Sequence, residues 1–356
     1  MNISFYVCSN GYGHLKRVLL VVNEILRLKP EQSITLFCTD EHRVFAQREI
    51  NFQSNSKINF DTSLSVNEIS WLSASTIKLT QYKQWADDLL ANHIFQSSSL
   101  VVSDNHVLPA RMHPNAMLMG SFLWHDATKI TSPDIAAIKE EEIGYLLKHK
   151  PELICVGDMV MPEIVYQTNP LRMPWFCTKY ESETSITRQN SFLVTGGGTE
   201  LINDTLLQVL DSVSRSNPGV LFFFDSKLYR RATFKDRVNI QLFGFEEYQF
   251  ASLSGVICRP GVGILTDCVR YNLPAIVLND AYNLEIEHNA NCVNYLEIGK
   301  SIDSFDTSIE TLSSNVSDLI NNTIYLKKFT NQLMGIQGGG AMKAAETILQ
   351  KLKTHE

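Results

Sequence analysis

Short runs of apolar residues alternate along the chain with longer stretches in which apolar residues recur every three or four positions. The short runs predict β-strands, and the longer stretches predict amphipathic helices. In the first half these elements are strands over 3–8, 33–38 and 100–103 and helices over 14–28 and 41–49. Regular alternation of strand and helix indicates a parallel sheet covered by helices on both faces.

The same alternation starts again after a polar stretch, residues 181–190, which carries no apolar period and which we interpret as a linker. The second half has predicted strands over 191–194, 220–224, 240–243, 255–258 and 275–278 and predicted helices over 201–213, up to 271 and over 341–353. The pattern therefore predicts an α/β protein with two Rossmann-like domains, residues 1–180 and 191–335, and a C-terminal segment, residues 336–356. A length of 356 residues suits two domains.

The composition is that of an ordinary globular protein, with 44% apolar and 19% charged residues. The formal net charge of −7 gives no general attraction for nucleic acid, so we expect no nucleic-acid partner. No apolar run approaches the ~20 residues that span a bilayer, and the N-terminus lacks the cationic lead of a secretory signal. The seven cysteines form no CxxC pair, which suits buried reduced thiols and argues against structural zinc. We therefore expect a cytoplasmic protein.

Three glycine-rich turns stand between a strand and a helix, at residues 11–13, 196–198 and 261–263. Free N–H groups at the start of a helix favour an anion, and glycine lets a ligand approach the backbone closely. Any one of these turns can equally be a tight turn needed only for packing. The last two follow the first and fourth strands of the second domain, at the edge where open parallel sheets bind ligands. Together they predict a diphosphate site.

The first turn is not a dinucleotide fingerprint, because Lys16 stands where the third glycine would fall. It does place His14 at the start of a helix, where an imidazole is suited to take a proton from a hydroxyl near neutral pH. Asp104 ends the strand over 100–103, so we expect it at the same sheet edge, where a carboxylate could fix the imidazole tautomer. Helix capping is the alternative for both residues. The spacing of His106, His113 and His125 matches no metal motif, and we assign no metal.

At this point the residues resemble the GT-B nucleotide-sugar glycosyltransferases. The turn over 11–17 reads GxGHxxR and is similar to a branch that includes the glycosyltransferase-like domain of arabinokinase and, with a similar turn, the nucleotide-sugar hydrolase of pseudaminic acid synthesis. Residues 259–267 are similar to the family's (K/R)-P-G-x-G-T-x-x-E. Residues 272–274 and 285–290 look like its G-x-P and (D/E)-Q-x-x-N-A, and 122–126 are a weaker match to F-x-W-x-D.

The resemblance implies a GT-B fold, in which two Rossmann-like domains face each other across a cleft and the C-terminal helix crosses back to the first domain. It implies that His14 is the general base and Asp104 its orienting partner, and we expect no cofactor. Trp124 and Asp126 would contact the acceptor. The donor would be bound by Gly13, Arg17, Gly197, Gly198, Thr199, Arg259, Gly261, Gly263, Asp267, Glu285 and Asn289.

Three positions depart from the family pattern. Asp267 stands where the family usually has a Glu that bonds the ribose hydroxyls, and Ile286 replaces a polar residue that often contacts the donor sugar. Asn272 replaces a glycine, in a loop position where asparagine tolerates a positive φ.

The expected reaction is a metal-independent, inverting transfer of a sugar from a nucleoside-diphosphate sugar to an acceptor hydroxyl. A UDP-sugar is the first candidate for the donor. A nucleotide-sugar hydrolase or epimerase would use the same histidine and stays open. A catalytically silent sugar-nucleotide binder or scaffold subunit also stays open, on account of Ile286. The acceptor would be a glycan, a lipid-linked glycan or a small molecule, bound by the loops over 51–82 and 107–131; a lipid-linked acceptor would bring peripheral contact with a membrane.

Overall fold

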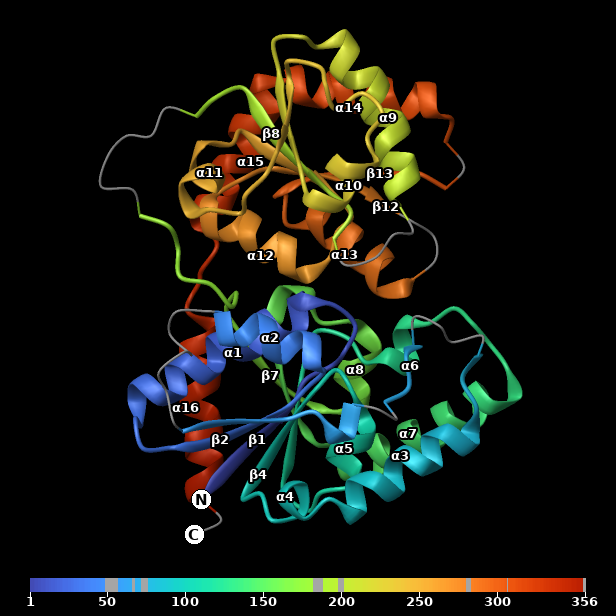
Figure 1. Ribbon diagram of the computed structural model, residues 1–356, viewed down its shortest axis with the longest axis vertical. Helices are drawn as coiled ribbons and strands as arrows, with labels where there is room; N and C mark the ends of the chain where they lie inside the picture. Colours follow the sequence, from blue (N-terminus) through green and yellow to red (C-terminus); the bar gives the residue numbers. More distant parts are fainter. Residues whose placement is uncertain are drawn as a thin grey trace. The chain divides into compact units, whose positions relative to one another are not determined.

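The computed structural model describes the chain except for residues 49–56, 66–67, 72–75, 182–187, 198–201, 280–282, 306 and 355–356. The chain divides into two compact units (Figure 1). The first unit consists of Met1–Phe176 together with Gly339–Glu356, and the second consists of Cys177–Gly338. The C-terminal helix α16 (Gly340–Lys353) therefore belongs to the first unit, where it packs along helix α1 (Tyr12–Leu28).

The described residues of the first unit form a seven-stranded sheet in which all neighbouring strands are parallel. In sheet order the strands are β3 (Ile58–Asp61), β2 (Ser33–Phe37), β1 (Asn2–Tyr6), β4 (Leu100–Asp104), β5 (Ala116–Met119), β6 (Glu152–Val156) and β7 (Asn169–Met173). The direction in which strands are added reverses between β1 and β4. In open α/β sheets, ligands bind at the carboxyl ends of the strands on either side of such a reversal.

Helices and short 3-10 turns connect these strands. They are α1, α2 (Asp40–Arg48), η1 (Ser63–Ser65), α3 (Leu79–Ala91), α4 (His93–Gln96), α5 (Val107–Arg111), α6 (Trp124–Ala127), α7 (Pro133–His149), η3 (Gly157–Met159), α8 (Pro162–Gln167) and α16. The apolar positions of α1 recur every three or four residues, and all seven of its buried residues are aliphatic. The sheet is thus covered on its faces, and β4 is buried along its whole length.

The second unit repeats the plan with a six-stranded parallel sheet. In sheet order its strands are β10 (Ile240–Leu242), β9 (Leu221–Phe224), β8 (Ser191–Thr195), β11 (Gly255–Cys258), β12 (Ala275–Asn279) and β13 (Gly299–Asp303). Its helices are α9 (Asn203–Ser216), α10 (Ser226–Arg231), α11 (Glu247–Ser252), α12 (Val262–Tyr271), α13 (Leu284–Tyr295), α14 (Ile309–Asn321) and α15 (Thr323–Gly335). Here the reversal lies between β8 and β11.

Each unit has its own hydrophobic core. All seven cysteines are buried and none forms a disulfide, as the sequence predicts. Among the described residues, no helix combines the length and the apolarity needed to cross a membrane. Of the predicted linker, residues 182–187 lie outside the part of the chain that the structure describes.

Candidate functional site

His14 and Asp104 meet at the reversal point of the first sheet. Gly11 has a φ of 98°, a conformation that glycine adopts without strain, and the chain turns there into α1. His14 lies in the first turn of this helix, and its Nδ1 lies 2.8 Å from an Oδ of Asp104 at the end of β4. The Asp104 side chain is fully buried, whereas that of His14 is 12% exposed. Neither residue caps a helix, since the cap of α1 is Gly11 and the Asp104 oxygens contact other groups.

The charges around His14 stabilise its protonated form. Burial opposes a charged imidazole, but Cys8 and Asp104 outweigh this effect and raise the pKa of His14 above its ordinary value. Burial likewise opposes a charged Asp104, but Arg17 and His14 lower the pKa of its carboxyl, so it is ionised at neutral pH. Because Nδ1 donates to this carboxylate, Nε2 is the nitrogen that could accept a proton from a substrate.

Arg17 contacts both Asp104 and Asn105. The Arg17 guanidinium donates to Asp104 and to the Asn105 side chain. Asn105 has a φ of 60°, and its amide donates to the Phe122 carbonyl at 2.5 Å. The sequence predicts that Arg17 contacts the donor diphosphate; the structure directs its guanidinium to Asp104 instead, and its role toward a donor stays a prediction.

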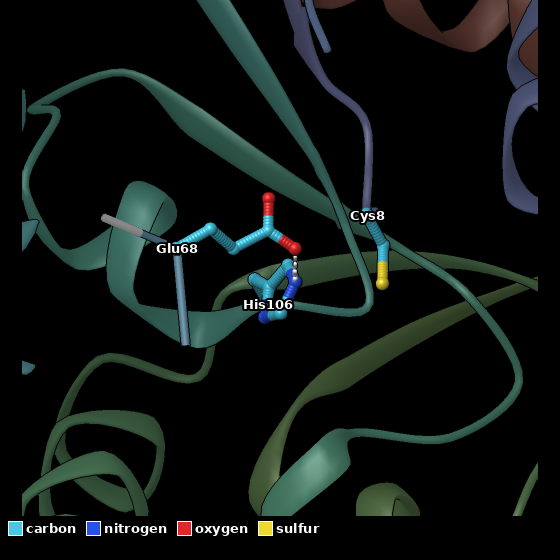
Figure 2. A group of neighbouring side chains, drawn as sticks. All are labelled: Cys8, Glu68 and His106. Atoms are coloured by element: carbon cyan, nitrogen blue, oxygen red, sulfur yellow. Dashed lines mark hydrogen bonds and ion pairs between the residues drawn. The ribbon is translucent and has the colours of Figure 1, made fainter. Parts of the chain in front are cut away.

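A second buried group lies next to this pair, formed by Cys8, Glu68 and His106 (Figure 2). His106 Nε2 lies 2.9 Å from Oε1 of Glu68, and both side chains are 1% exposed. The same Oε1 accepts the backbone N–H of Ser9 at 2.9 Å and the Ser9 hydroxyl at 2.7 Å. Despite burial, Cys8 and Glu68 raise the pKa of His106 well above its ordinary value, and His106 and Ser9 lower the pKa of Glu68. The two side chains form a buried ion pair.

The same group offers the donor set of a zinc site. One ligand atom from each of Cys8, Glu68 and His106 lies within 4.8 Å of the others, and thiolate, imidazole and carboxylate all bind Zn²⁺. However, Oε1 of Glu68 already accepts three hydrogen bonds. The hydrogen bonds thus favour the ion pair of Glu68 and His106 over a metal ion at this position.

The ring of Trp124, a predicted acceptor residue, lies near the imidazole of His14. Its indole N–H donates to the Cys8 sulfur at 3.2 Å, its ring centroid lies 6.2 Å from that of His14, and the residue is 5% exposed. Asp126 contacts His125 at 3.3 Å and Gln167 at 3.4 Å. An acceptor contact by either residue stays a prediction.

In the second unit, the turn after β8 brings Gly196 and Gly197 to the reversal point. Gly197 has a φ of 72°, and its N–H donates to the Thr195 hydroxyl at 3.1 Å. A Cβ at Gly196 would lie 2.0 Å from Oδ1 of Asn203, a residue that is 1% exposed. The predicted donor residues Gly198 and Thr199 lie outside the described residues.

The turn after β11 lies beside it, since the Arg259 N–H donates to the Thr195 carbonyl at 3.3 Å. Gly261 is the N-cap of α12, and no side chain caps this helix. Asn289 donates to the Pro260 carbonyl at 2.9 Å and to Glu285 at 3.2 Å, which fastens α13 to the turn. The free N–H groups at the start of α12 are a site where an anion could bind.

The remaining predicted donor residues lie on α12 and α13. Gly263 is exposed on α12 and Asp267 is partly buried. Asn272 adopts the predicted positive φ, 54°. Ile286 is fully buried in α13, so this departure from the family pattern packs inside the unit instead of facing a ligand.

Solved structures match over nearly the whole chain. The spinosyn rhamnosyltransferase SpnG complexed with thymidine diphosphate gives a TM-score of 0.64 at 12% identity, covering 98% of this chain and 99% of that one. Medicago truncatula UGT71G1 complexed with UDP-glucose gives 0.65 at 11% identity, covering 99% and 98%. CalG4, the calicheamicin glycosyltransferase, gives 0.62 at 13% identity, covering 99% and 98%. The chain has the GT-B fold.

The GT-B fold confirms the predicted fold class. No protein-family model matches the chain, and no curated protein matches it. Identities of 11–13% establish the fold of this GT-B chain and nothing more about its chemistry.

Sequence reasoning missed Cys8, Glu68 and Asn105 at the N-terminal site of the GT-B chain. Asn105 and His106 follow Asp104 directly, and the end of a strand at a sheet reversal is a signal that could have identified them. Glu68 comes from a short segment without apolar period, so only the folded chain reveals its contact with His106.

Proposed function

We propose that this GT-B chain is a glycosyltransferase in which His14 is the general base. The observation that carries the proposal is the pair of His14 and buried Asp104, which leaves one imidazole nitrogen for a substrate. Structures with the same fold are named glycosyltransferases and hold thymidine diphosphate or UDP-glucose. We therefore assign a nucleoside-diphosphate sugar as the donor and a hydroxyl group as the acceptor. Among donors, a UDP-sugar is the first candidate.

In the proposed reaction, Nε2 of His14 takes the proton of the acceptor hydroxyl while the oxygen attacks the anomeric carbon. The bond from that carbon to the diphosphate oxygen breaks, and the nucleoside diphosphate leaves with the bonding electrons. Asp104 stabilises the imidazolium that forms. A single displacement of this kind inverts the anomeric carbon. N–H groups at the uncapped start of α12 would stabilise the charge on the leaving diphosphate, so the proposal requires no metal.

Binding of the donor is tested first, by thermal unfolding with UDP, TDP, GDP, CDP and ADP. A ligand at 100 times its Kd adds about 2.7 kcal/mol of stability. The test variant is Gly261→Trp, because a Cβ at Gly261 meets no atom within 4 Å and the indole would cover the start of α12. The matched control is Gly219→Trp, which is equally open but precedes β9 at the opposite edge of the same sheet.

Stabilisation of wild type and Gly219→Trp by one nucleotide, and not of Gly261→Trp, supports the donor site. The matching sugar nucleotide is then incubated with and without candidate acceptors. Transfer should fall by about 10²- to 10⁴-fold in His14→Gln, while nucleotide stabilisation persists. Release of free sugar at an unchanged rate without acceptor would assign a hydrolase, and stabilisation by none of the nucleotides would contradict the donor site.

A further inference from the structure

We propose that Glu68 is a positioning residue for His14: with His106 it holds Ser9, and so fixes the turn that delivers the base. The effect on turnover rests on the proposed function, whereas the effect on His14 itself does not. Among the residues that the structure describes, Glu68 has no hydrogen bond or ion pair with His14, so it would act through the turn between Ser9 and His14.

Glu68 holds Ser9 through two hydrogen bonds. A single carboxylate oxygen accepts both the N–H and the hydroxyl of Ser9, at 2.9 and 2.7 Å. Hydrogen bonds to a charged acceptor are stronger than those between neutral groups. His106 contacts the same oxygen at 2.9 Å (Figure 2), which keeps the carboxylate charged inside the unit. Ser9 is therefore held by two hydrogen bonds to a charged acceptor.

The turn between Ser9 and His14 links Glu68 to the proposed base. The Gly11 N–H donates to the Ser9 carbonyl at 2.8 Å, and α1 begins at Tyr12 without a side-chain cap. The turn is thus held at its start by Glu68 and at its far end by the contact of His14 with Asp104. If the contact between Glu68 and Ser9 is lost, the start of the turn can move, because no side-chain cap holds it there. The hydrogen bond from His14 to Asp104 should then weaken.

The charge of Glu68 favours the protonated form of the buried His106. The ionisable groups that surround the pair and the base are Tyr6, Cys8, His14, Arg17, His42 and Asp104. A glutamine at position 68 could still accept from Ser9, but it would leave a charged His106 buried without a counter-ion. Burial would then lower the pKa of His106, although Cys8 still favours its protonated form. Ser9→Ala removes no charge, so a shift of the His14 midpoint in both variants comes from movement of the turn and not from a changed charge.

The same unit supplies a matched control. His125 and Glu142 form a second buried pair, with Nδ1 of His125 2.8 Å from the carboxylate and side-chain exposures of 0% and 4%. Glu142→Gln breaks a buried histidine–glutamate pair as Glu68→Gln does. Among the described residues, no hydrogen bond or ion pair joins Glu142 to Ser9 or His14.

The experiment is an NMR titration of the imidazole nitrogens of ¹⁵N-labelled full-length protein. Because the contact with Asp104 raises the pKa of His14, its midpoint should fall in Glu68→Gln by about half a pH unit or more and stay within about 0.2 in Glu142→Gln. Ser9→Ala keeps both charges and one donor, and should shift the midpoint less in the same direction. This milder variant also serves if Glu68→Gln does not fold.

Turnover gives an independent readout. If a sugar nucleotide is turned over, kcat of Glu68→Gln should fall by about ten-fold with KM nearly constant, since a displaced base affects the chemical step. Absence of turnover in wild type would refute the proposed function and leave the titration to decide on Glu68. An unchanged His14 midpoint in Glu68→Gln and Ser9→Ala, or an equal shift in Glu142→Gln, would overturn the proposal. Binding of one equivalent of a transition metal per chain by wild type, with loss of this binding in Cys8→Ser, would also overturn the proposal.

Discussion

The Nδ1 atom of His14 lies 2.8 Å from the carboxylate of Asp104, although 90 positions separate the two residues in the chain. Strands β1 and β4 are direct neighbours in the sheet, and their carboxyl ends come together where the strand order reverses. His14 follows β1 through the turn at Gly11, and Asp104 is the last residue of β4. The topology thus brings together a histidine and a carboxylate that are far apart in the sequence.

Asp104→Asn should displace the pH dependence of turnover and reduce its rate. Asp104 raises the pKa of His14, so the acidic limb of the kcat/KM profile in wild type should lie above the ordinary imidazole value of about 6.5. The base must be neutral to act, and removal of the carboxylate charge should move this limb to lower pH. The rate on the plateau should fall by up to about 10⁴-fold, because asparagine does not hold the productive tautomer. A limb that stays in place would show that another group titrates.

Arg17→Met separates two roles for this arginine. In the structure the guanidinium contacts Asp104 and Asn105, and its side chain is 11% exposed. If that is its role, the variant should lose about 3 kcal/mol of stability, as is typical when one partner of a buried ion pair is removed. Its affinity for the stabilising nucleoside diphosphate, measured by calorimetry, should stay within about two-fold. A loss of affinity of about ten-fold or more would instead return Arg17 to the donor site, as the sequence predicts.

Apolar periodicity was sufficient to predict the two doubly wound sheets, but it missed five of the strands that the structure describes, namely β3, β5, β6, β7 and β13. In β3, β7 and β13 several positions are exposed or only partly buried, which interrupts the apolar run, and β7 contains Pro170, a residue that is rare inside sheets. The strand predicted over 3–8 ends at Tyr6. Val7 and Cys8 are still buried, so the apolar run extends beyond the last residue of the strand.

The candidate site was predictable where a residue stands beside a strand end or a glycine turn. His14, Asp104 and Gly261 were found in this way. The pair of Glu68 and His106 could not be found, since the contact joins a segment without periodicity to a strand end 38 positions away. The environment of Ile286 was also beyond the sequence, because a helical position reveals its burial only when the face that packs is known.

Gly196→Ala should destabilise the second unit through one identifiable contact. An added Cβ would lie 2.0 Å from Oδ1 of Asn203, so this buried side chain must move, at a cost of about 1–3 kcal/mol. Gly197→Ala is the comparison, since its Cβ meets no atom within 4 Å and only the φ of 72° causes strain. Asn203→Ala should recover most of the loss in Gly196→Ala and none in Gly197→Ala. Chemical unfolding of the three single and two double variants measures the coupling, and additive effects in both pairs would contradict the contact.

The pair of His125 and Glu142 should make stability depend on pH on the alkaline side. Asp126 and Glu142 overcome burial and raise the pKa of His125 to about 10. Between the unfolded value of about 6.5 and the folded value, the native state holds a proton that the unfolded state has released, so stability falls as pH rises. The contribution is therefore complete below about pH 6.5 and is lost as the pH rises through about 10.

Glu142→Gln should be less stable than wild type by about 3 kcal/mol near pH 6, and the difference should shrink toward pH 10. Tyr82 donates to the same carboxylate at 3.1 Å, so Tyr82→Phe is the control for loss of a neutral hydrogen bond. Its destabilisation should stay constant over this range, because its hydroxyl pKa is raised further by burial and Glu142. Urea unfolding at several pH values measures both differences. A gap for Glu142→Gln that does not narrow with pH would mean that His125 is neutral in the folded chain.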